Sequence, residues 1–167
     1  MASTIFSSVD YELVIKKSRF IACIQPVADR ASAQAVVQQL WAQHPDATHI
    51  CWALLAGGQS AAVDDGEPSG TAGRPMLEVL RHHDLEGVLA TVVRYFGGVK
   101  LGAGGLVRAY TDAVAQALQR AEKVPLRRLC TQQCAVPYAM EGWMRRQLEQ
   151  SAAVLLAVEH QTQVKMQ

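Results

Sequence analysis

The 167-residue sequence has no excess of basic residues, no long apolar run and no signal-peptide pattern in its first residues. Sixteen Lys and Arg against fifteen Asp and Glu leave a formal charge of +1, whereas proteins that coat nucleic acid carry a clear basic excess. No window offers the roughly 20 apolar residues that span a bilayer. The first eight residues, MASTIFSS, have neither the basic region nor the apolar core of a signal peptide. We therefore expect a cytoplasmic protein that has no membrane partner and is not a polycationic nucleic-acid coat.

The cysteines show no CxxC pair and no metal-type spacing, so we expect buried, reduced thiols at Cys23, Cys51, Cys130 and Cys134. His49 and Cys51 are two residues apart on a predicted strand, and such residues share a face. A nucleophile–base pair at these two positions is conceivable, but a metal site would need two more ligands that no spacing suggests. We predict no catalytic residue, no metal and no cofactor.

The composition, with 50% apolar and 19% charged residues, is typical of a folded chain. Apolar periodicity predicts an α+β fold, with strands over residues 11–17, 18–25, 48–56 and 87–96 and helices over 29–43, 75–82 and 106–122. Residues 57–73 contain five glycines and Pro68, which predicts irregular structure. Pro125 marks a boundary, after which we predict a strand, a helix and a strand over 128–137, 140–150 and 153–158.

Two glycine-rich segments stand out, residues 64–75 (DDGEPSGTAGRP) and residues 94–110 (RYFGGVKLGAGGLVRAY). In the second, glycines lie between a predicted strand and a predicted helix, where free backbone N–H groups can hold an anion and Arg94, Lys100 and Arg108 can add charge. The same glycines can instead supply tight turns and close contacts, and both interpretations stay open. The segment contains neither a Walker loop nor a GxGxxG fingerprint.

The first segment places three carboxylates near two hydroxyl side chains. Such oxygen ligands suit Mg²⁺, but the same groups also cap helices and bind loop amides, and we favour capping. Together the two segments supply the candidate ligand- or phosphate-binding residues: Asp64, Asp65, Glu67, Ser69, Thr71, Arg74, Arg94, Gly97, Gly98, Lys100, Gly102, Gly104, Gly105 and Arg108.

Both segments resemble signatures of the IMPACT/YigZ family. Residues 64–76 are similar to its first signature and residues 92–98 with 101–110 to its second, and the stretches 18–22 and 44–47 also fit. The resemblance implies that residues 1–124 form an IMPACT N-terminal-like domain. Its fold would be a two-layer α/β sandwich of the type shared by a ribosomal small-subunit protein, elongation factor G domain IV and the GHMP kinases. Residues 125–167 would form a partial ferredoxin-like β-α-β segment, similar to half of elongation factor G domain V.

The resemblance also implies a cytosolic, non-enzymatic regulator linked to translation, because eukaryotic relatives regulate translation under amino-acid starvation. By fold analogy it implies contact with RNA or the ribosome, without DNA specificity. For such a contact we expect one phosphate-facing groove, lined by Arg19, Arg74, Arg94, Lys100 and Arg108. Two alternatives stay open. One is an enzyme or sensor that binds a small phosphorylated ligand in the glycine-rich loops. The other is a protein-interaction module, with a protein partner, in which those loops are architectural.

Overall fold

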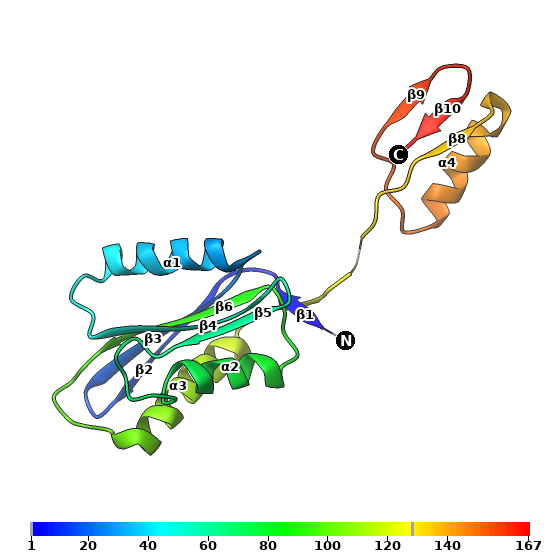
Figure 1. The fold of residues 1–167 in the computed structure, drawn as a ribbon. Helices are drawn as coiled ribbons and strands as arrows, with labels where there is room; N and C mark the ends of the chain where they lie inside the picture. The colour runs from blue at the N-terminus through cyan, green and yellow to red at the C-terminus, as the bar shows by residue number, and fades with distance from the viewer. Residues whose placement is uncertain (1, 128) are drawn as a thin grey trace. The chain divides into compact units, whose positions relative to one another are not determined.

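The computed structural model describes residues 2–127 and 129–167, and its contacts divide the chain after Leu126 into two compact units. We call these unit 1 and unit 2 and describe each by itself. Helices and antiparallel sheets occur together in the described residues, so the predicted mixed α+β class is confirmed (Figure 1). None of the helices in the described ranges is long and apolar enough to cross a bilayer.

Unit 1 is built on a five-stranded antiparallel sheet with the order β2-β3-β6-β4-β5. Its strands are β2 (Val9–Ile15), β3 (Ser18–Pro26), β4 (His49–Ala56), β5 (Gln59–Val63) and β6 (Val88–Tyr95). A separate two-stranded sheet pairs β1 (Ser3–Ile5) with β7 (Lys123–Pro125). The sequence patterns did not predict β1, β5 or β7. The strand β5 lies in the segment predicted to be irregular, because Gly57 and Gly58 form the turn that folds it back onto β4.

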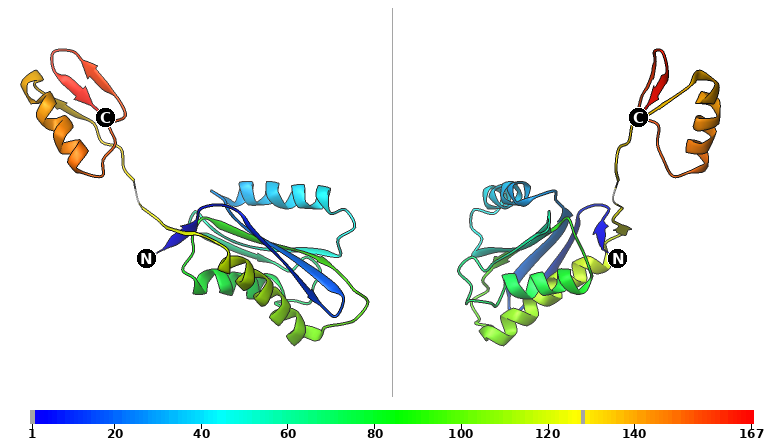
Figure 2. Two further views of the ribbon diagram at one scale, coloured as in Figure 1. Left: turned by 180° about the vertical axis from the view of Figure 1, so that it is seen from behind. Right: turned by 45° about the vertical axis from the view of Figure 1, so that its right-hand side comes forward.

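Helices cover both faces of the sheet (Figures 1 and 2). On one face lies α1 (Arg30–Gln43), and on the other lie α2 (Gly73–His82) and α3 (Gly102–Gln119). Unit 1 therefore has three layers, and the prediction of a two-layer sandwich omitted the layer that α1 adds. The N-cap of α1 is Asp29, whose carboxylate accepts a 2.8 Å hydrogen bond from the Ser32 backbone N–H.

The main core of unit 1 lies between the sheet and the pair α2 and α3, around Phe20, Met76, Leu80 and Tyr110. The buried face of α3 includes Ala109, Ala113 and Ala117, whose small side chains let the helix backbone lie close to the sheet. A smaller cluster, which includes Trp52 and Leu54, lies under α1. Ala33 is the one residue of this helix that is buried. The weak burial of α1 leaves space between this helix and part of the sheet.

The helix starts differ from the predictions in both signature segments. The helix α2 begins at Gly73 rather than residue 75, and α3 begins at Gly102 rather than residue 106 and ends at Gln119 rather than residue 122. Gly104 and Gly105 therefore belong to the first turn of α3 instead of the loop before it. Local propensity disfavours glycine in a helix, so tertiary packing overrides it here.

Unit 2 is a three-stranded antiparallel sheet with the order β8-β10-β9 and one helix. Its elements are β8 (Cys134–Val136), the short 3₁₀ helix η1 (Tyr138–Met140), α4 (Glu141–Gln150), β9 (Val158–His160) and β10 (Val164–Met166). The predicted helix is confirmed. The predicted strands were wrong in extent, since β8 occupies only three residues of the first and β9 begins where the second should end; residue 128 lies outside the described residues.

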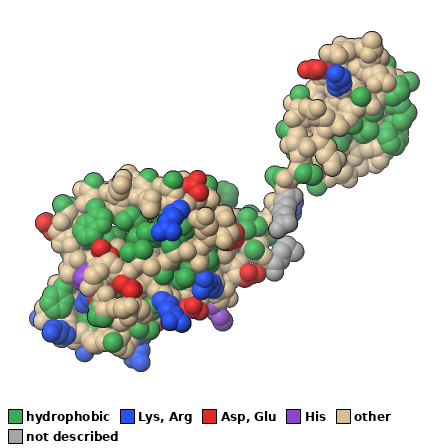
Figure 3. Space-filling view, viewed as in Figure 1, with side chains coloured by type: hydrophobic (Ala, Val, Ile, Leu, Met, Phe, Trp, Pro, Cys, Tyr) green, Lys and Arg blue, Asp and Glu red, His purple; other side chains and the backbone are tan. Residues whose placement is uncertain are grey.

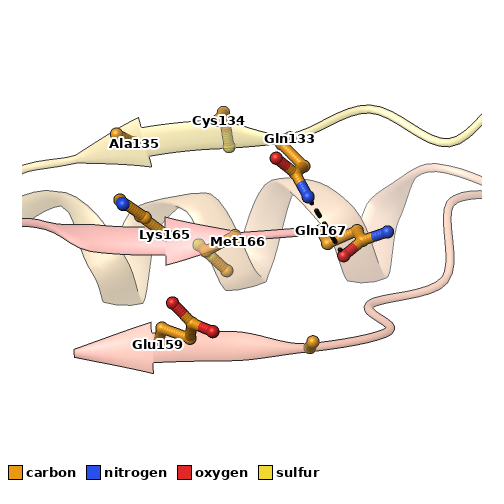
Figure 4. Close-up of a pocket in the computed structure, with 8 residues that line it drawn as sticks. Gln133, Cys134, Ala135, Glu159, Lys165, Met166 and Gln167 are labelled. Atoms are coloured by element: carbon orange, nitrogen blue, oxygen red, sulfur yellow. Dashed lines mark hydrogen bonds between the residues drawn. The ribbon is translucent and has the colours of Figure 1, made fainter.

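The core of unit 2 is small, with Val136, Val164 and Met166 buried. Along its sheet runs a cavity of about 370 Å³, lined by residues that include Glu159, Lys165 and Met166 (Figure 4). At one end the Gln133 side-chain amide donates to Gln167 Oε1 at 3.3 Å. Cys130 and Cys134 are exposed, which corrects the expectation that all four thiols are buried.

Candidate functional site

The two signature segments meet at one end of the unit 1 sheet, on the side of α2 and α3. The loop between β5 and α2 carries Glu67, which is 7% exposed. Arg94, the penultimate residue of β6, is 5% exposed. Tyr110, in the third turn of α3, is fully buried. Three elements that are distant in sequence therefore contribute one buried polar side chain each.

These three side chains form a connected network. Glu67 Oε1 accepts a charge-assisted hydrogen bond from Arg94 Nη1 and a 2.7 Å hydrogen bond from the Tyr110 hydroxyl. A buried charge is tolerated only when it is paired and hydrogen-bonded. The guanidinium also lies over the rings of Phe20 and Phe96, at 5.3 and 5.6 Å from their centroids. Arg94 Nε has no hydrogen-bond partner among the described residues.

The carboxylates of Asp64 and Asp65 are satisfied by backbone amides. Asp64 accepts hydrogen bonds from the N–H groups of Gly70, Ala72 and Gly73, at 2.9, 3.2 and 2.8 Å, and so caps the start of α2. Burial opposes ionisation of the Asp64 carboxyl, but these three donors outweigh it and hold its pKa below the ordinary value. Asp65 Oδ2 accepts from the Ile50 N–H at 2.8 Å. These contacts match the capping role favoured over magnesium.

His49 and Cys51 bind the acidic loop rather than each other. His49 Nδ1 lies 2.7 Å from the Asp65 carbonyl oxygen, and Cys51 Sγ lies 3.0 Å from the Asp64 carbonyl oxygen and 3.4 Å from the Tyr110 hydroxyl. Burial raises the pKa of Cys51 to about 12. The Cys51 thiol therefore keeps its proton at neutral pH, whereas a nucleophilic cysteine needs a depressed pKa.

Metal ligation finds no support in the part of the chain that the structure describes. Its His, Cys, Asp and Glu side chains form no group of three or more that could hold a metal ion. Thr71 is also occupied locally, because its hydroxyl donates to the Pro68 carbonyl oxygen at 2.6 Å.

Two signature glycines allow backbones to approach closely. A Cβ atom added to Gly97 would lie 2.1 Å from the carbonyl carbon of Lys17, and one added to Gly73 would lie 2.4 Å from the nitrogen of Val63. The N–H of Gly97 donates to Ser18 Oγ at 3.1 Å. Gly97 thus joins the loop between β6 and α3 to the turn between β2 and β3, which favours an architectural role for this glycine.

The predicted phosphate-facing groove of five basic residues needs correction, because Arg94 is buried and paired with Glu67. Arg19 is exposed, but its Nε lies 2.6 Å from Glu12 Oε1. The candidate residues that remain exposed at the surface are Ser69, Arg74, Gly98, Lys100, Gly102, Gly104 and Arg108.

At this end of the sheet the sequence predicted one feature and missed another. Adjoining strands over 11–17 and 18–25 predict a tight connection, and Lys16 and Lys17 form the two-residue turn between β2 and β3, with φ angles of +46° and +66°. The two lysines were not selected as site residues. Tyr110 was quoted in the second signature but was not selected as a site residue; its place in the small-residue face of α3 is the signal that could have identified it.

The comparisons with known proteins agree with this fold and these motifs. Residues 16–118 match the family model of the Impact N-terminal domain. The chain is 39% identical over 167 residues to the IMPACT family member YvyE of Bacillus subtilis (strain 168), covering 98% of this chain and 77% of that protein. It is 48% identical over 111 residues to the IMPACT family member YigZ of Escherichia coli (strain K12), covering 64% and 54%, respectively.

Among solved structures, one described as a hypothetical protein is similar over 99% of this chain and 84% of its own, with a TM-score of 0.75 and 36% identity. The match to the family domain covers more than half of this chain, and the signature segments lie inside it. The chain belongs to the IMPACT family.

Proposed function

We propose that this chain is a non-enzymatic, cytoplasmic binding protein that contacts RNA on the ribosome and acts in translation. The carrying observation is a basic end of unit 1, which we define by Lys16, Lys17, Phe96, Val99 and Lys100. Lys16 and Lys17 lie in the turn between β2 and β3, and the other three residues lie in the loop after β6. Gly97 brings this turn and this loop into contact. Figure 3 shows Lys and Arg side chains gathered along the lower edge of this unit.

The composition of the basic end supports binding to phosphates. Residues 13–20 and 94–108 contain no Asp or Glu, although the whole chain is nearly neutral. All three lysines of the basic end are exposed. Positive charge is therefore concentrated locally, and such a patch attracts the phosphate backbone without an overall basic excess.

Apolar exposure at the basic end supports contact with unpaired bases. Phe96 is 48% exposed and Val99 is 43% exposed, on a loop whose position is set by the Gly97 contact. Proteins that bind single-stranded nucleic acid combine a basic surface with aromatic side chains on which bases stack. The proposal therefore favours single-stranded or loop RNA over duplex DNA.

The test is binding of the full chain to purified ribosomal subunits by co-sedimentation, and to a fluorescent single-stranded RNA, over a series of salt concentrations. The test variant replaces Lys16, Lys17 and Lys100 by Ala. Removing three phosphate contacts should weaken binding and reduce the slope of log K against log salt by about 2, at roughly 0.7 per contact.

The matched control replaces three exposed basic residues elsewhere in unit 1, Arg30, Arg81 and Lys123, by Ala, which changes the net charge equally. We expect the control to bind with a nearly unchanged slope, and thermal melting to show that both variants are folded. Absence of wild-type binding at low salt, or equal losses in the two variants, would refute the proposal.

A further inference from the structure

The cleft left open by α1 is a second feature that the signature segments do not explain. It lies between α1 and the sheet, on the face opposite α2 and α3, and has a volume of about 350 Å³. Ligand pockets in proteins begin at about 300 Å³. It is lined by β2, β3 and β6 on one side and by the C-terminal half of α1 on the other.

The cleft exists because α1 packs over only part of the sheet. Val36 and Val37 pack toward the cluster around Trp52 and Leu54 on β4, so α1 contacts β4 more closely than β2 or β3. Strand alternation places Asp10 on the same sheet face as Cys23, its register partner on β3. A carboxylate thus lies on a sheet face beside an open space.

The walls of the cleft are apolar, and polar groups are set among them. Ile21 and Val93 contribute from the sheet, and Val36 and Leu40 from α1. A space bounded by apolar groups on a sheet and on a helix suits a flat ligand. The polar lining comes mainly from Asp10 and from glutamine side chains at positions 25, 39 and 43.

The charge of the cleft limits the ligand class. No Lys or Arg lines it, and Asp10 is its carboxylate. His44 is engaged elsewhere, because its Nδ1 lies 2.6 Å from the Tyr95 hydroxyl. Burial, with the nearby Asp10 carboxylate, raises the pKa of Cys23 to about 12, so this thiol stays neutral. A phosphate or carboxylate ligand would therefore meet the Asp10 carboxylate and no Lys or Arg.

We propose that this cleft binds a small planar ligand with adjacent N–H donors on one edge, the chemistry of a guanine base or a guanidinium group. The Asp10 carboxylate accepts both donors of that edge, and the amides of Gln39 and Gln43 serve the remaining polar atoms. Adenine is disfavoured because its edge presents a ring-nitrogen acceptor beside its amino group, and this acceptor would face the carboxylate. An alkylammonium lacks the planar pair of donors.

The test is NMR titration of the ¹⁵N-labelled full chain with guanosine and with arginine, and with adenosine and lysine as comparison ligands. Guanosine contains no phosphate, so its binding does not depend on the basic end. We expect saturable shifts of the Gln39 and Gln43 side-chain amide signals with guanosine or arginine, and much weaker shifts with the comparison ligands. Which of the first two binds more tightly identifies the source of the N–H pair.

Two variants complete the experiment. Asp10→Asn should weaken binding by at least about tenfold, because it removes a charged acceptor of two hydrogen bonds. The matched control Glu12→Gln neutralises the next outward-facing carboxylate on β2, which does not line the cleft, and should leave affinity unchanged. Absence of shifts up to the solubility of guanosine and with arginine, or equal affinity of Asp10→Asn and wild type, would overturn the proposal.

Discussion

Replacing Glu67 by Ala should strongly destabilise unit 1, because it leaves a buried guanidinium without its counter-ion. The side chains of Glu67 and Arg94 are 3% and 6% exposed, and the Tyr110 hydroxyl loses its acceptor in the same variant. Removing one partner of a buried ion pair costs about 3–5 kcal/mol. We expect a loss of this size in the free energy of unfolding.

The assay is urea unfolding followed by tryptophan fluorescence. A Trp143→Phe background confines the signal to Trp41 and Trp52, which both lie in unit 1. The midpoint should fall while the dependence of stability on urea stays constant, which marks a loss of stability without a change in the surface exposed on unfolding.

A second substitution tests the physical reason. The double variant Glu67→Leu, Arg94→Met removes both charges and should be more stable than Glu67→Ala, since apolar pairs often replace buried ion pairs without loss. Glu12→Ala, which breaks the exposed pair with Arg19, is the matched control and should not change the midpoint measurably. If Glu67→Ala costs less than about 1 kcal/mol, well below the range for a buried pair, the network does not stabilise the fold.

The remaining predictions concern the cap, two glycines and the exposed ring. Asp64→Ala should cost about 1–2 kcal/mol by uncapping α2. Because the folded pKa of Asp64 is depressed, the wild type should lose this contribution as pH falls through that pKa, and urea titrations below pH 5 should show a smaller pH dependence in the variant. Gly97→Ala should lower the melting temperature sharply, because its Cβ would overlap the backbone of Lys17, whereas Gly104→Ala, with open space around its Cβ, should be neutral or stabilising. Phe96→Ala should weaken RNA binding about 5- to 150-fold, the equivalent of about 1–3 kcal/mol for one stacked base, and unchanged anisotropy curves would contradict stacking.

The buried network also explains why two long signatures occur in one domain. The acidic loop is held by its capping of α2, by contacts with Ile50, His49 and Cys51, and by the bonds that Glu67 accepts from Arg94 and Tyr110. Most candidate residues in the loop therefore stabilise its shape, and apart from Ser69 the exposed candidates lie beyond it. This division is why the proposed RNA contact rests on the basic end rather than on the carboxylates.

Local patterns in the sequence were sufficient for much of the fold. Alternating and helical periodicity predicted β2, β3, α1, β4, β6 and α4 near their observed places, because this signal acts within a few residues. The motifs were sufficient for the family. The short strands β1, β5 and β7 were missed, because three to five residues carry too little periodicity and depend on a distant partner for their pairing.

Only the tertiary structure decided which polar residues are buried and which are free to bind. Arg94 and Arg108 are equivalent as basic residues in the sequence, yet one is paired inside the core and the other is exposed. The contact of Gly97 with Lys17 and the cleft beside α1 likewise join segments that are remote along the chain. Burial and pairing depend on how the elements pack in three dimensions, and residue type or spacing does not determine that packing.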